Sequence, residues 1–325
     1  MKPRVSIIVP VYNGARFLPG AVRSLLDQSF TDFELIIVND GSLDNTLEVA
    51  KSFSADTRVS ILNLPSNRGV SAARNSGIEN SSGELVAFFD HDDLALKDML
   101  RIQVGILEAY PEAALVNADV AFIDENGIIF DKFKNMPASR FANPNGKLIV
   151  SNQINELFES CYIHSNTVMV RRRALEKVGL FDEALRYAED YNLWLRMAHY
   201  FQVAHIATIV TYYRQHGVQA TINKNALLLG KFRALEAYMK ACPDYKEKIN
   251  PSVRRNRMGR VHASLAGHFF WNEQDYRSAR RHYLKSWKCG VWNQESLVRF
   301  AYCWLPHSIR ALVRKGRHRI RGGSS

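Results

Sequence analysis

The chain has 325 residues, 46% of them hydrophobic, which is enough for a large globular domain and an appendage. No apolar run approaches the roughly 20 residues that a membrane-spanning helix needs, and the run before Pro10 is too short for a signal peptide. Cys161, Cys242, Cys289 and Cys303 show no metal-binding or redox spacing. We therefore expect a cytoplasmic protein in a reducing compartment.

The net charge of +11 is unevenly distributed along the chain. Up to Ile222 there are 21 Lys and Arg against 26 Asp and Glu, whereas from Asn223 onward there are 22 against 6. The basic character therefore belongs to the C-terminal third. This difference predicts two parts, a catalytic domain over residues 1–222 and a basic helical extension over residues 223–325.

Strand and helix patterns alternate in the first part of the chain. A strand over residues 5–9 is followed by turn residues and a helical pattern over residues 18–28. Further strands over residues 33–38 and 59–64 each lead into another helical pattern. Repeated units of this kind predict an α/β fold with a mostly parallel central sheet and helices on both faces.

A fourth strand runs directly into acidic residues. Residues 84–93 form an apolar stretch that ends in Asp90, Asp92 and Asp93. Carboxylates are hard oxygen ligands, and ligands bind at the carboxyl ends of strands in open α/β sheets. The pattern predicts a site for a divalent cation and a phosphate. The alternative is an acidic turn that ends the strand and caps a helix beginning near Leu96.

Two neighbours extend this site toward a nucleotide. Asp40 follows the second strand and could accept hydrogen bonds from a base or ribose, and Arg74 could face a diphosphate. The structural alternatives are that Asp40 only shapes a turn and that Arg74 only pairs with a surface acid. The chain lacks Gly-x-Gly-x-x-Gly and a Lys-bearing phosphate loop, which counts against a dehydrogenase or a P-loop enzyme.

Several motifs in the same order resemble the nucleotide-binding half of family 2 glycosyltransferases. A later block is similar to that family's acceptor-side Glu-Asp motif, and the whole resemblance covers about residues 4–220. The matching segments are residues 5–13, residues 34–42 with Asp44, Asn67 and Gly69 with Ala73-Arg74-Asn75, Asp90 and Asp92, residues 179–183, and residues 188–196.

The resemblance implies a GT-A type α/β domain that transfers a sugar from a nucleotide donor, most simply a UDP-sugar, with inversion at the anomeric carbon. It assigns Asp40 to the nucleoside, Asp90 and Asp92 to the ribose and the metal, and Asp92 to direct metal ligation. His91 is a departure, because a small or acidic residue is more usual there. The implied donor side comprises Pro10, Val11, Tyr12, Asn13, Asp40, Asn67, Arg74, Asp90, His91 and Asp92.

The resemblance also assigns an acceptor side. Asp190 matches the general base, and Glu189 and Trp194 accompany it. The alternative for Glu189 and Asp190 is favourable negative charge in the first turn of a helix that runs to about Tyr200. Acceptor specificity is expected to reside in residues 126–164.

His216 closes a strand-like stretch that begins near Gln202. In the family a histidine after a Tyr-Arg pair can reach the metal, expected to be Mn²⁺ or Mg²⁺, or the diphosphate. The alternative is an ordinary surface histidine. The serine that often follows in the family is replaced here by the stretch of residues 219–221.

The C-terminal third has a helical pattern. Residues that resemble one tetratricopeptide-type hairpin are Ala266, Gly267, Phe270, Tyr276, Ala279 and Tyr283. One such repeat cannot form a stable solenoid, so we expect it to pack on the catalytic domain.

Apolar and basic residues alternate after that hairpin, through residues 287–321. This mixture suits the interface of an anionic membrane, and we favour a peripheral contact at the inner membrane face over nucleic-acid binding or a merely solvated helical face. Residues 322–325 are expected to be disordered.

The predicted function is metal-dependent, inverting glycosyl transfer to a glycan or lipid-linked acceptor in surface polysaccharide or glycolipid synthesis. One alternative is a sugar nucleotidyltransferase, which would usually carry a Gly/Arg/Lys-rich N-terminal loop that residues 11–14 do not provide. The other is a non-catalytic protein that binds nucleic acid or anionic membrane through its basic C-terminal third.

Overall fold

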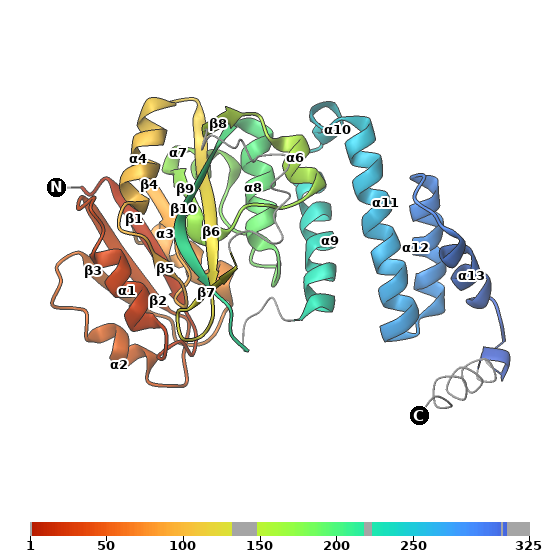
Figure 1. Cartoon of the computed structure of the whole chain (residues 1–325), viewed down its shortest axis with the longest axis horizontal. Helices are drawn as coiled ribbons and strands as arrows, with labels where there is room; N and C mark the ends of the chain where they lie inside the picture. Colours follow the sequence, from red (N-terminus) through yellow and green to blue (C-terminus); the bar gives the residue numbers. More distant parts are fainter. Residues whose placement is uncertain (1, 132–147, 218–222, 307, 311–325) are drawn as a thin grey trace. The chain divides into compact units, whose positions relative to one another are not determined.

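The computed structural model describes residues 2–131, 148–217, 223–306 and 308–310. The chain divides into two compact units, Met1–Lys248 and Ile249–Ser325. The first is a mixed, mostly parallel sheet flanked by helices, and the described part of the second is helical (Figure 1). The predicted fold class is confirmed.

The elements of the first unit are β1 (Val5–Val11), α1 (Leu18–Leu26), β2 (Phe33–Asn39), α2 (Thr46–Lys51), β3 (Val59–Asn63), α3 (Val70–Glu79), β4 (Leu85–Phe88), β5 (Leu94–Ala95), α4 (Met99–Ala109), β6 (Ala113–Ile123), β7 (Ile129–Asp131), β8 (Leu148–Ser151), α6 (Ile154–Glu159), the 3₁₀ turn η1 (Ser165–Thr167), β9 (Met169–Arg171), α7 (Arg172–Val178), α8 (Glu189–Tyr200), β10 (Gln202–Arg214), α9 (Lys224–Ala241) and α10 (Tyr245–Lys248). Those of the second unit are α11 (Pro251–His268), the π turn η3 (Phe269–Glu273), α12 (Tyr276–Lys288) and α13 (Gln294–Tyr302).

The sheet has the strand order β3-β2-β1-β4-β9-β6-β10-β5, with β7 beside β6 and β8 beside β10. The strands β3, β2, β1 and β4 are parallel to one another. The strand β9 runs antiparallel to both β4 and β6, and β10 is parallel to β6. The carboxyl ends of β1, β2, β4, β6 and β10 therefore meet at one edge, which positions the candidate site.

The central strands are mostly apolar because both faces of the sheet are covered. Ile7 and Val9 belong to a core cluster with residues of α1 and α4, whereas Ile8 faces α3 on the other side. All seven residues of β1 are buried. A strand with two buried faces shows a continuous apolar run in place of polar alternation, as this sequence does.

A glycine in α3 permits the close approach of that helix to the sheet. A Cβ added at Gly77 would lie 2.4 Å from the Ile8 Cγ2 atom, whereas one added at Gly105 in α4 would meet nothing within 4 Å. We expect Gly77→Ala to destabilise the protein by about 1–3 kcal/mol through overpacking. The matched change Gly105→Ala is expected to stabilise it by about 0.5–1 kcal/mol, because alanine is the better helix former. Urea unfolding measures both, and equal effects would contradict this packing.

Two local predictions need correction. The segment expected to open a helix near Leu96 instead forms β5, which pairs with Thr211 and Tyr212 of β10, and α4 begins only at Met99. The first strand continues through Pro10, because β1 and β4 stop pairing at Ile8 and the missing Pro10 N–H faces that unpaired side.

The helix α9 packs with the first unit. The Asn192 Nδ2 atom of α8 donates to the Ala234 carbonyl of α9 at 3.0 Å, and the Tyr238 hydroxyl lies 2.9 Å from His199 Nδ1. The boundary between the two compact units therefore follows Lys248. The boundary between the acidic and the basic part of the sequence lies between residues 222 and 223.

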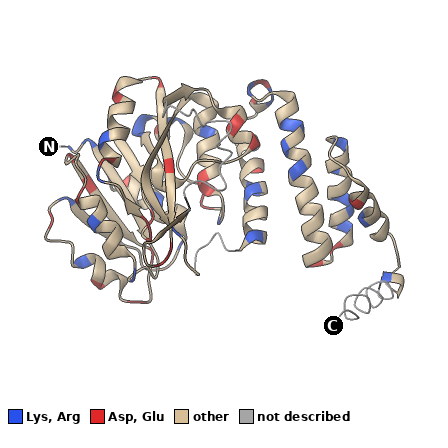
Figure 2. Ribbon diagram, in the orientation of Figure 1, with Lys and Arg blue, Asp and Glu red and all other residues tan. Residues whose placement is uncertain are grey.

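The second unit has a small core of its own. Ala266, Phe270, Ala279 and Tyr283, all singled out by the hairpin pattern, cluster there with Cys303. Basic side chains are spread over its helices (Figure 2). The expectations for residues 312–321 and for the tail of residues 322–325 lie outside the described residues. In the described parts of the chain, no helix is both long and apolar enough to cross a membrane.

The helical unit is expected to lose stability below pH 6.5. The Nδ1 atoms of His262 in α11 and His282 in α12 lie 3.0 Å apart. Burial, with Lys285 nearby, lowers the pKa of each imidazole to about 4. Because the unfolded chain takes up these protons near pH 6.5, stability falls as the pH drops from about 6.5 toward 4.

Circular dichroism melts of the full chain between pH 7.5 and pH 4.5 measure this loss. The variant His262→Gln/His282→Gln should show a flatter dependence on pH than the wild-type chain. An unchanged slope in that variant would contradict the assignment to this histidine pair.

Candidate active site

Polar side chains gather where the strands β2, β4 and β10 end. Asp40 follows β2, Asp90 follows β4, and His216 follows β10. The first turn of α8 is joined to the same edge, because Arg74 contacts both Asp90 and Glu189. The carboxyl edge of an open α/β sheet is the usual place for a ligand.

The loops after β1 and β2 hold each other in place. Asn13 has a left-handed backbone with φ 50°, and its side-chain oxygen accepts from the Leu43 N–H at 2.8 Å. The Ser42 hydroxyl accepts from the Asn13 N–H at 2.9 Å. Gly41 has φ 65°, and a Cβ there would lie 2.5 Å from the Ser66 backbone. Glycine is therefore required where the loop after β2 meets the loop after β3.

Four of the predicted donor residues differ in their accessibility. Pro10 and Val11 are buried within β1, so that they can face a ligand only through their backbone. Tyr12 is 39% exposed, and Asn67 is exposed in the loop before α3. Tyr12 and Asn67 thus remain open to a ligand, and nucleotide contact by all four stays a prediction.

Asp40 is buried and shapes the loop that precedes α3. Its two carboxylate oxygens accept hydrogen bonds from the backbone N–H groups of Arg68 and Gly69, each at 2.8 Å. These contacts join the loop after β2 to the loop before α3, so that Asp40 has a structural role beyond its own turn. Each carboxylate oxygen has a second lone pair, so a nucleoside contact remains chemically available.

Arg74 joins two acidic residues from different elements. Its guanidinium contacts Asp90 Oδ1 at 2.9 Å and Glu189 Oε1 at 2.8 Å, and its side chain is only 4% exposed. We call this pair of contacts the Arg74 bridge; it joins the residue that follows β4 to the first turn of α8. The alternative of an acid partner describes these contacts, and the predicted contact with a diphosphate stays a prediction.

The carboxylates of the Arg74 bridge titrate abnormally. Burial and the neighbouring charge of Asp190 raise the pKa of Glu189 to about 7 against the opposing effect of Arg74. Burial also raises the pKa of Asp90, and the nearby Asp92 adds to the shift. The positive charge of the Arg74 guanidinium offsets the repulsion between the Asp90 and Glu189 carboxylates.

Asp92 and His216 form a second pair at the same edge. The Asp92 Oδ2 and His216 Nε2 atoms lie 2.8 Å apart, with little of either side chain exposed. The ring of Phe17 packs 4.8 Å from the His216 ring, centroid to centroid. These contacts bring together two of the predicted metal-site residues from sequence positions 124 residues apart.

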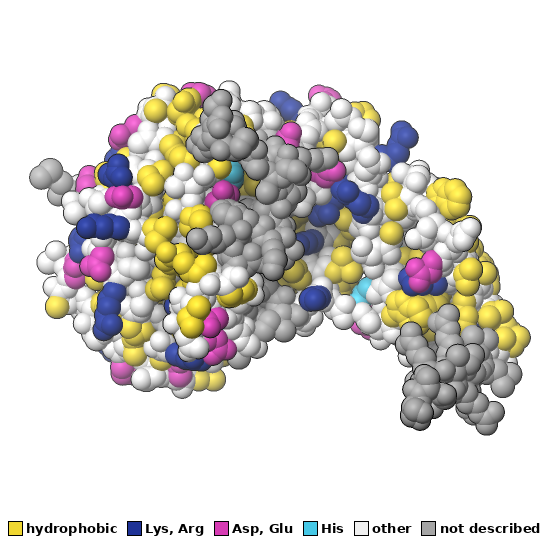
Figure 3. All heavy atoms as spheres, viewed as in Figure 1, with side chains coloured by type: hydrophobic (Ala, Val, Ile, Leu, Met, Phe, Trp, Pro, Cys, Tyr) yellow, Lys and Arg dark blue, Asp and Glu magenta, His cyan; other side chains and the backbone are white. Residues whose placement is uncertain are grey.

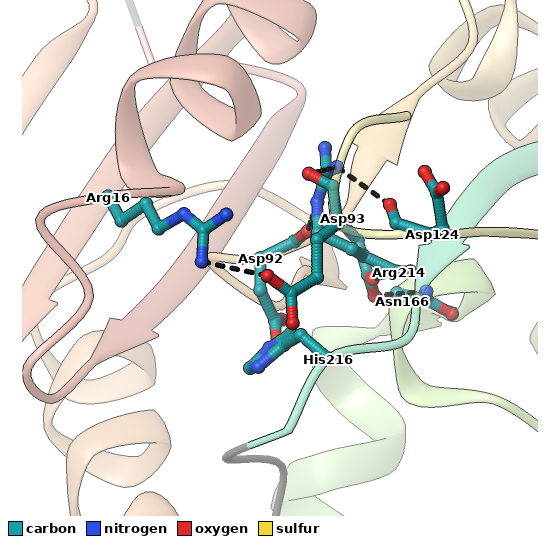
Figure 4. Close-up of polar contacts among 8 residues, drawn as sticks. Arg16, Asp92, Asp93, Asp124, Asn166, Arg214 and His216 are labelled. Carbon is teal, nitrogen blue, oxygen red and sulfur yellow. Dashed lines mark hydrogen bonds and ion pairs between the residues drawn. The ribbon is translucent and has the colours of Figure 1, made fainter. Parts of the chain in front are cut away.

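Arg214 and Asp93 fix the backbone around Asp92 (Figure 4). The Arg214 Nε atom donates to the Asp92 carbonyl at 2.9 Å, and its backbone N–H donates to Asp93 Oδ1 at 2.8 Å. Asn166 of η1 also donates to Asp93. Asp93 is therefore occupied by structural hydrogen bonds, and burial raises the pKa of its carboxyl well above the usual range.

His91 packs over the loop that follows β1. A Cβ added at Gly14 would lie 2.3 Å from His91 Cδ2 and 2.5 Å from Val11 Cγ2, so this contact depends on glycine. The imidazole thus contacts the first loop of the site, and its predicted role in donor binding remains a prediction.

Asp190 lies in the first turn of α8. Its Oδ2 atom accepts from the Ser165 hydroxyl at 2.7 Å, and Ala188 before it has a left-handed φ of 58°. Burial lowers the pKa of the nearby His164, with Asp190 opposing the shift. The Asp190 carboxylate is half-buried, and its role as general base stays a prediction.

Trp194, which the resemblance assigns to the acceptor side with Asp190, belongs to the buried core. The Trp194 side chain has no exposed surface and packs against Phe88 of β4 and Phe181. A side chain with no exposed surface cannot touch an acceptor. Trp194 therefore acts on the site only through packing, by holding α8 against the sheet.

The residues present fit a divalent cation in chemical type. A carboxylate oxygen of Asp92 and an imidazole nitrogen of His216 are ligands that Mn²⁺ accepts, and sites of this kind complete their coordination with substrate phosphates. Among the residues that the structure describes, no group of three or more His, Cys, Asp or Glu side chains could hold a metal without such additional ligands.

Sequence reasoning did not assign roles to Ser165, Asn166 or Arg214. Ser165 and Asn166 lie in η1, a three-residue turn that no motif marks. Arg214 belongs to the Tyr-Arg pair before His216, and that pair was the available signal. Its guanidinium also donates to the carbonyls of Asp124 and Glu125, which only the folded chain brings near.

The family profile described as "Glycosyl transferase family 2" matches residues 6–179, more than half of the chain. The chain belongs to glycosyltransferase family 2. This family 2 enzyme carries the matched segment from β1 to the end of α7.

Curated relatives of this family 2 glycosyltransferase agree with the assignment. An uncharacterized glycosyltransferase of Rickettsia typhi is 33% identical over 67% of this chain and 66% of its own length. A relative in Rickettsia felis is 31% identical, but the match spans 35% of that protein. The Escherichia coli protein named UDP-Glc:alpha-D-GlcNAc-diphosphoundecaprenol beta-1,3-glucosyltransferase WfgD is 28% identical over 77% of this chain and 88% of its own.

The fold is also similar to that of solved structures of S. aureus TarS. The structure described as TarS 1-349 in complex with UDP-GlcNAc has a TM-score of 0.57 and 17% identity, over 93% of this chain and 90% of that one. The structure in complex with UDP has a TM-score of 0.55. At this identity, the likeness concerns the fold of the enzyme.

Proposed function

We propose that this enzyme transfers a sugar from a nucleoside diphosphate sugar to an acceptor hydroxyl, with inversion at the anomeric carbon. The observation that carries the proposal is the Arg74 bridge. It joins Asp90, next to Asp92 on the proposed donor side, to Glu189, next to Asp190 on the proposed acceptor side. A buried bridge of this kind sets the separation of the two half-sites.

The donor is expected to be a UDP-sugar. Support comes from the TarS structures, which were solved with UDP and UDP-GlcNAc, and from the UDP-Glc named for WfgD. In this chain the nucleoside would lie against Asp40, Tyr12 and Asn13, at the loops that follow β1 and β2. Tyr12 supplies an exposed aromatic face on which a base can stack.

Asp190 is the proposed general base. The acceptor oxygen forms a bond to the anomeric carbon as the bond from that carbon to the diphosphate oxygen breaks, and the hydroxyl proton passes to the Asp190 carboxylate. Attack opposite the leaving group inverts the configuration. The residue lies in the first turn of α8, where its side chain accepts a hydrogen bond from the Ser165 hydroxyl. General base catalysis of this kind contributes about 10²–10⁴-fold in rate.

Asp92 and His216 would hold a divalent cation, Mn²⁺ or Mg²⁺. When bound, the cation supplies positive charge where the leaving diphosphate gains negative charge. Arg214 positions the Asp92 backbone, and Phe17 packs against His216, so both side chains are oriented before any ligand binds.

The acceptor is expected to be a glycan or a lipid-linked glycan used in surface polysaccharide or glycolipid synthesis. The name of WfgD, which includes a diphosphoundecaprenol acceptor, supports this expectation. Nucleotide sugars would reach the enzyme from the cytoplasm, where we expect it to act. Within the predicted specificity region of residues 126–164, residues 132–147 lie outside the described residues.

A panel of UDP-, GDP-, dTDP- and CDP-sugars with Mn²⁺ tests the proposal. Nucleoside diphosphate release is measured with glycan and polyprenyl-diphosphate-linked acceptors, and the product's anomeric configuration is read by NMR. We expect UDP release that depends on acceptor and gives an inverted linkage. Release of pyrophosphate, or retention of configuration, would overturn the proposed reaction.

A further inference from the structure

The second unit exposes large apolar side chains close to arginines. We call this group the α13 surface, and its members are between 44% and 67% exposed. Figure 3 shows hydrophobic side chains gathered on this unit beside basic ones. The members of the α13 surface are Trp271, Trp292, Leu297, Val298, Trp304 and Ile309.

The helix α13 directs apolar residues away from the core of its unit. None of its residues is buried. Leu297, Val298 and Ala301 are exposed and fall within a sector of about 100° on a helix of 3.6 residues per turn. Phe300 and Cys303 lie outside this sector and pack in the small core. A surface helix normally presents its polar side to water, so this arrangement indicates a partner.

Arginines lie directly over the aromatic rings of this region. The guanidinium of Arg280 is 3.9 Å from the centroid of the Trp304 ring, and that of Arg299 is 5.2 Å from the Trp271 ring. Between residues 249 and 310 the chain has 11 Lys and Arg against 3 Asp and Glu. The partner of the α13 surface must therefore accept both apolar side chains and a strong positive charge.

We propose that the α13 surface binds the headgroup region of an anionic phospholipid bilayer. Tryptophan and aliphatic side chains enter the boundary between headgroups and acyl chains, while arginine and lysine remain at the level of the phosphates. Each basic residue near an anionic leaflet adds about 1 kcal/mol of attraction. An anionic bilayer thus matches both the positive charge and the apolar side chains of the α13 surface. This binding does not depend on the proposed glycosyl transfer.

A nucleic acid fits the α13 surface less well. Single strands bind by stacking bases on aromatic faces, and here guanidinium groups already cover a face of the Trp271 and Trp304 rings. Leu297, Val298 and Ile309 offer nothing to a base or a phosphate. In a bilayer interface, all of these side chains have a favourable environment.

Co-sedimentation of the full chain with vesicles tests the proposal. The probes are phosphatidylcholine vesicles with and without about 30% phosphatidylglycerol. We expect at least about tenfold tighter binding to the anionic vesicles, and a loss of about tenfold in Leu297→Glu/Val298→Glu. The matched control Asn256→Glu/Ser264→Glu makes the same charge change at exposed polar positions of α11 and should stay within about threefold of wild type.

Circular dichroism establishes that both variants keep their helices, and Trp292→Ser replaces the double variant if it does not fold. Binding that survives removal of the apolar side chains, or is equal on both vesicle types, would overturn the proposal. So would self-association, or binding of single-stranded RNA, that the double variant abolishes while vesicle binding persists. Removal of residues 311–325 should weaken vesicle binding only in part, and complete loss would assign binding to that basic segment.

Discussion

Asp190→Asn is expected to lower the turnover number by about 10²–10⁴-fold while nucleotide binding changes little. An amide is isosteric with the carboxylate and can still accept from the Ser165 hydroxyl, but it cannot take the acceptor proton. The loss should therefore appear in kcat, because the side chain acts in the transition state. Nucleoside diphosphate release and UDP titration measure the two effects separately.

The matched control for this variant is Glu79→Gln, the same chemical change at an exposed position at the end of α3. It should leave turnover unchanged. Full turnover in Asp190→Asn would remove Asp190 from catalysis, and loss of nucleotide binding with retained chemistry would place it on the donor side.

Arg74→Met is expected to destabilise the protein by about 3–5 kcal/mol, because it leaves the buried Glu189 and the partly exposed Asp90 without their cation. Nucleotide binding should weaken as well, since the guanidinium holds Asp90 at the donor side. Urea unfolding and UDP titration give the two readouts.

Arg68→Met is the matched control, because the Arg68 ion pair with Glu183 at 3.2 Å is exposed on both sides. Its loss should cost less than about 1 kcal/mol. Adding Glu189→Gln to Arg74→Met should recover part of the stability by removing one of the opposed carboxylates. Equal costs for Arg74→Met and Arg68→Met would contradict an interior bridge.

Much of the fold follows from the sequence because its causes are local or periodic. The strands β1 and β2 are apolar runs bounded by turn residues, and the helix α8 was expected to end at Tyr200, where it does end. The strand β5 was missed because its two residues are strands only through pairing with β10, which begins more than a hundred residues later.

The candidate site also has residues that the sequence marks and residues that only the folded structure reveals. Asp40, Asp90 and Asp92 are marked by their position after apolar strands, which sequence reveals. The Arg74 bridge is not marked, because whether an arginine faces a phosphate or a carboxylate depends on burial. The burial of Trp194 is not marked either, since a motif position does not tell which side of α8 faces the core.

The most direct test of the proposed donor site is calorimetric titration of the full chain with UDP, with and without Mn²⁺, in wild type, Asp92→Ala and Asp190→Asn. We expect binding at one site that requires the cation, disappears in Asp92→Ala and persists in Asp190→Asn. UDP binding with the same affinity in the absence of Mn²⁺, unchanged in Asp92→Ala, would contradict a donor site built on Asp92 and His216.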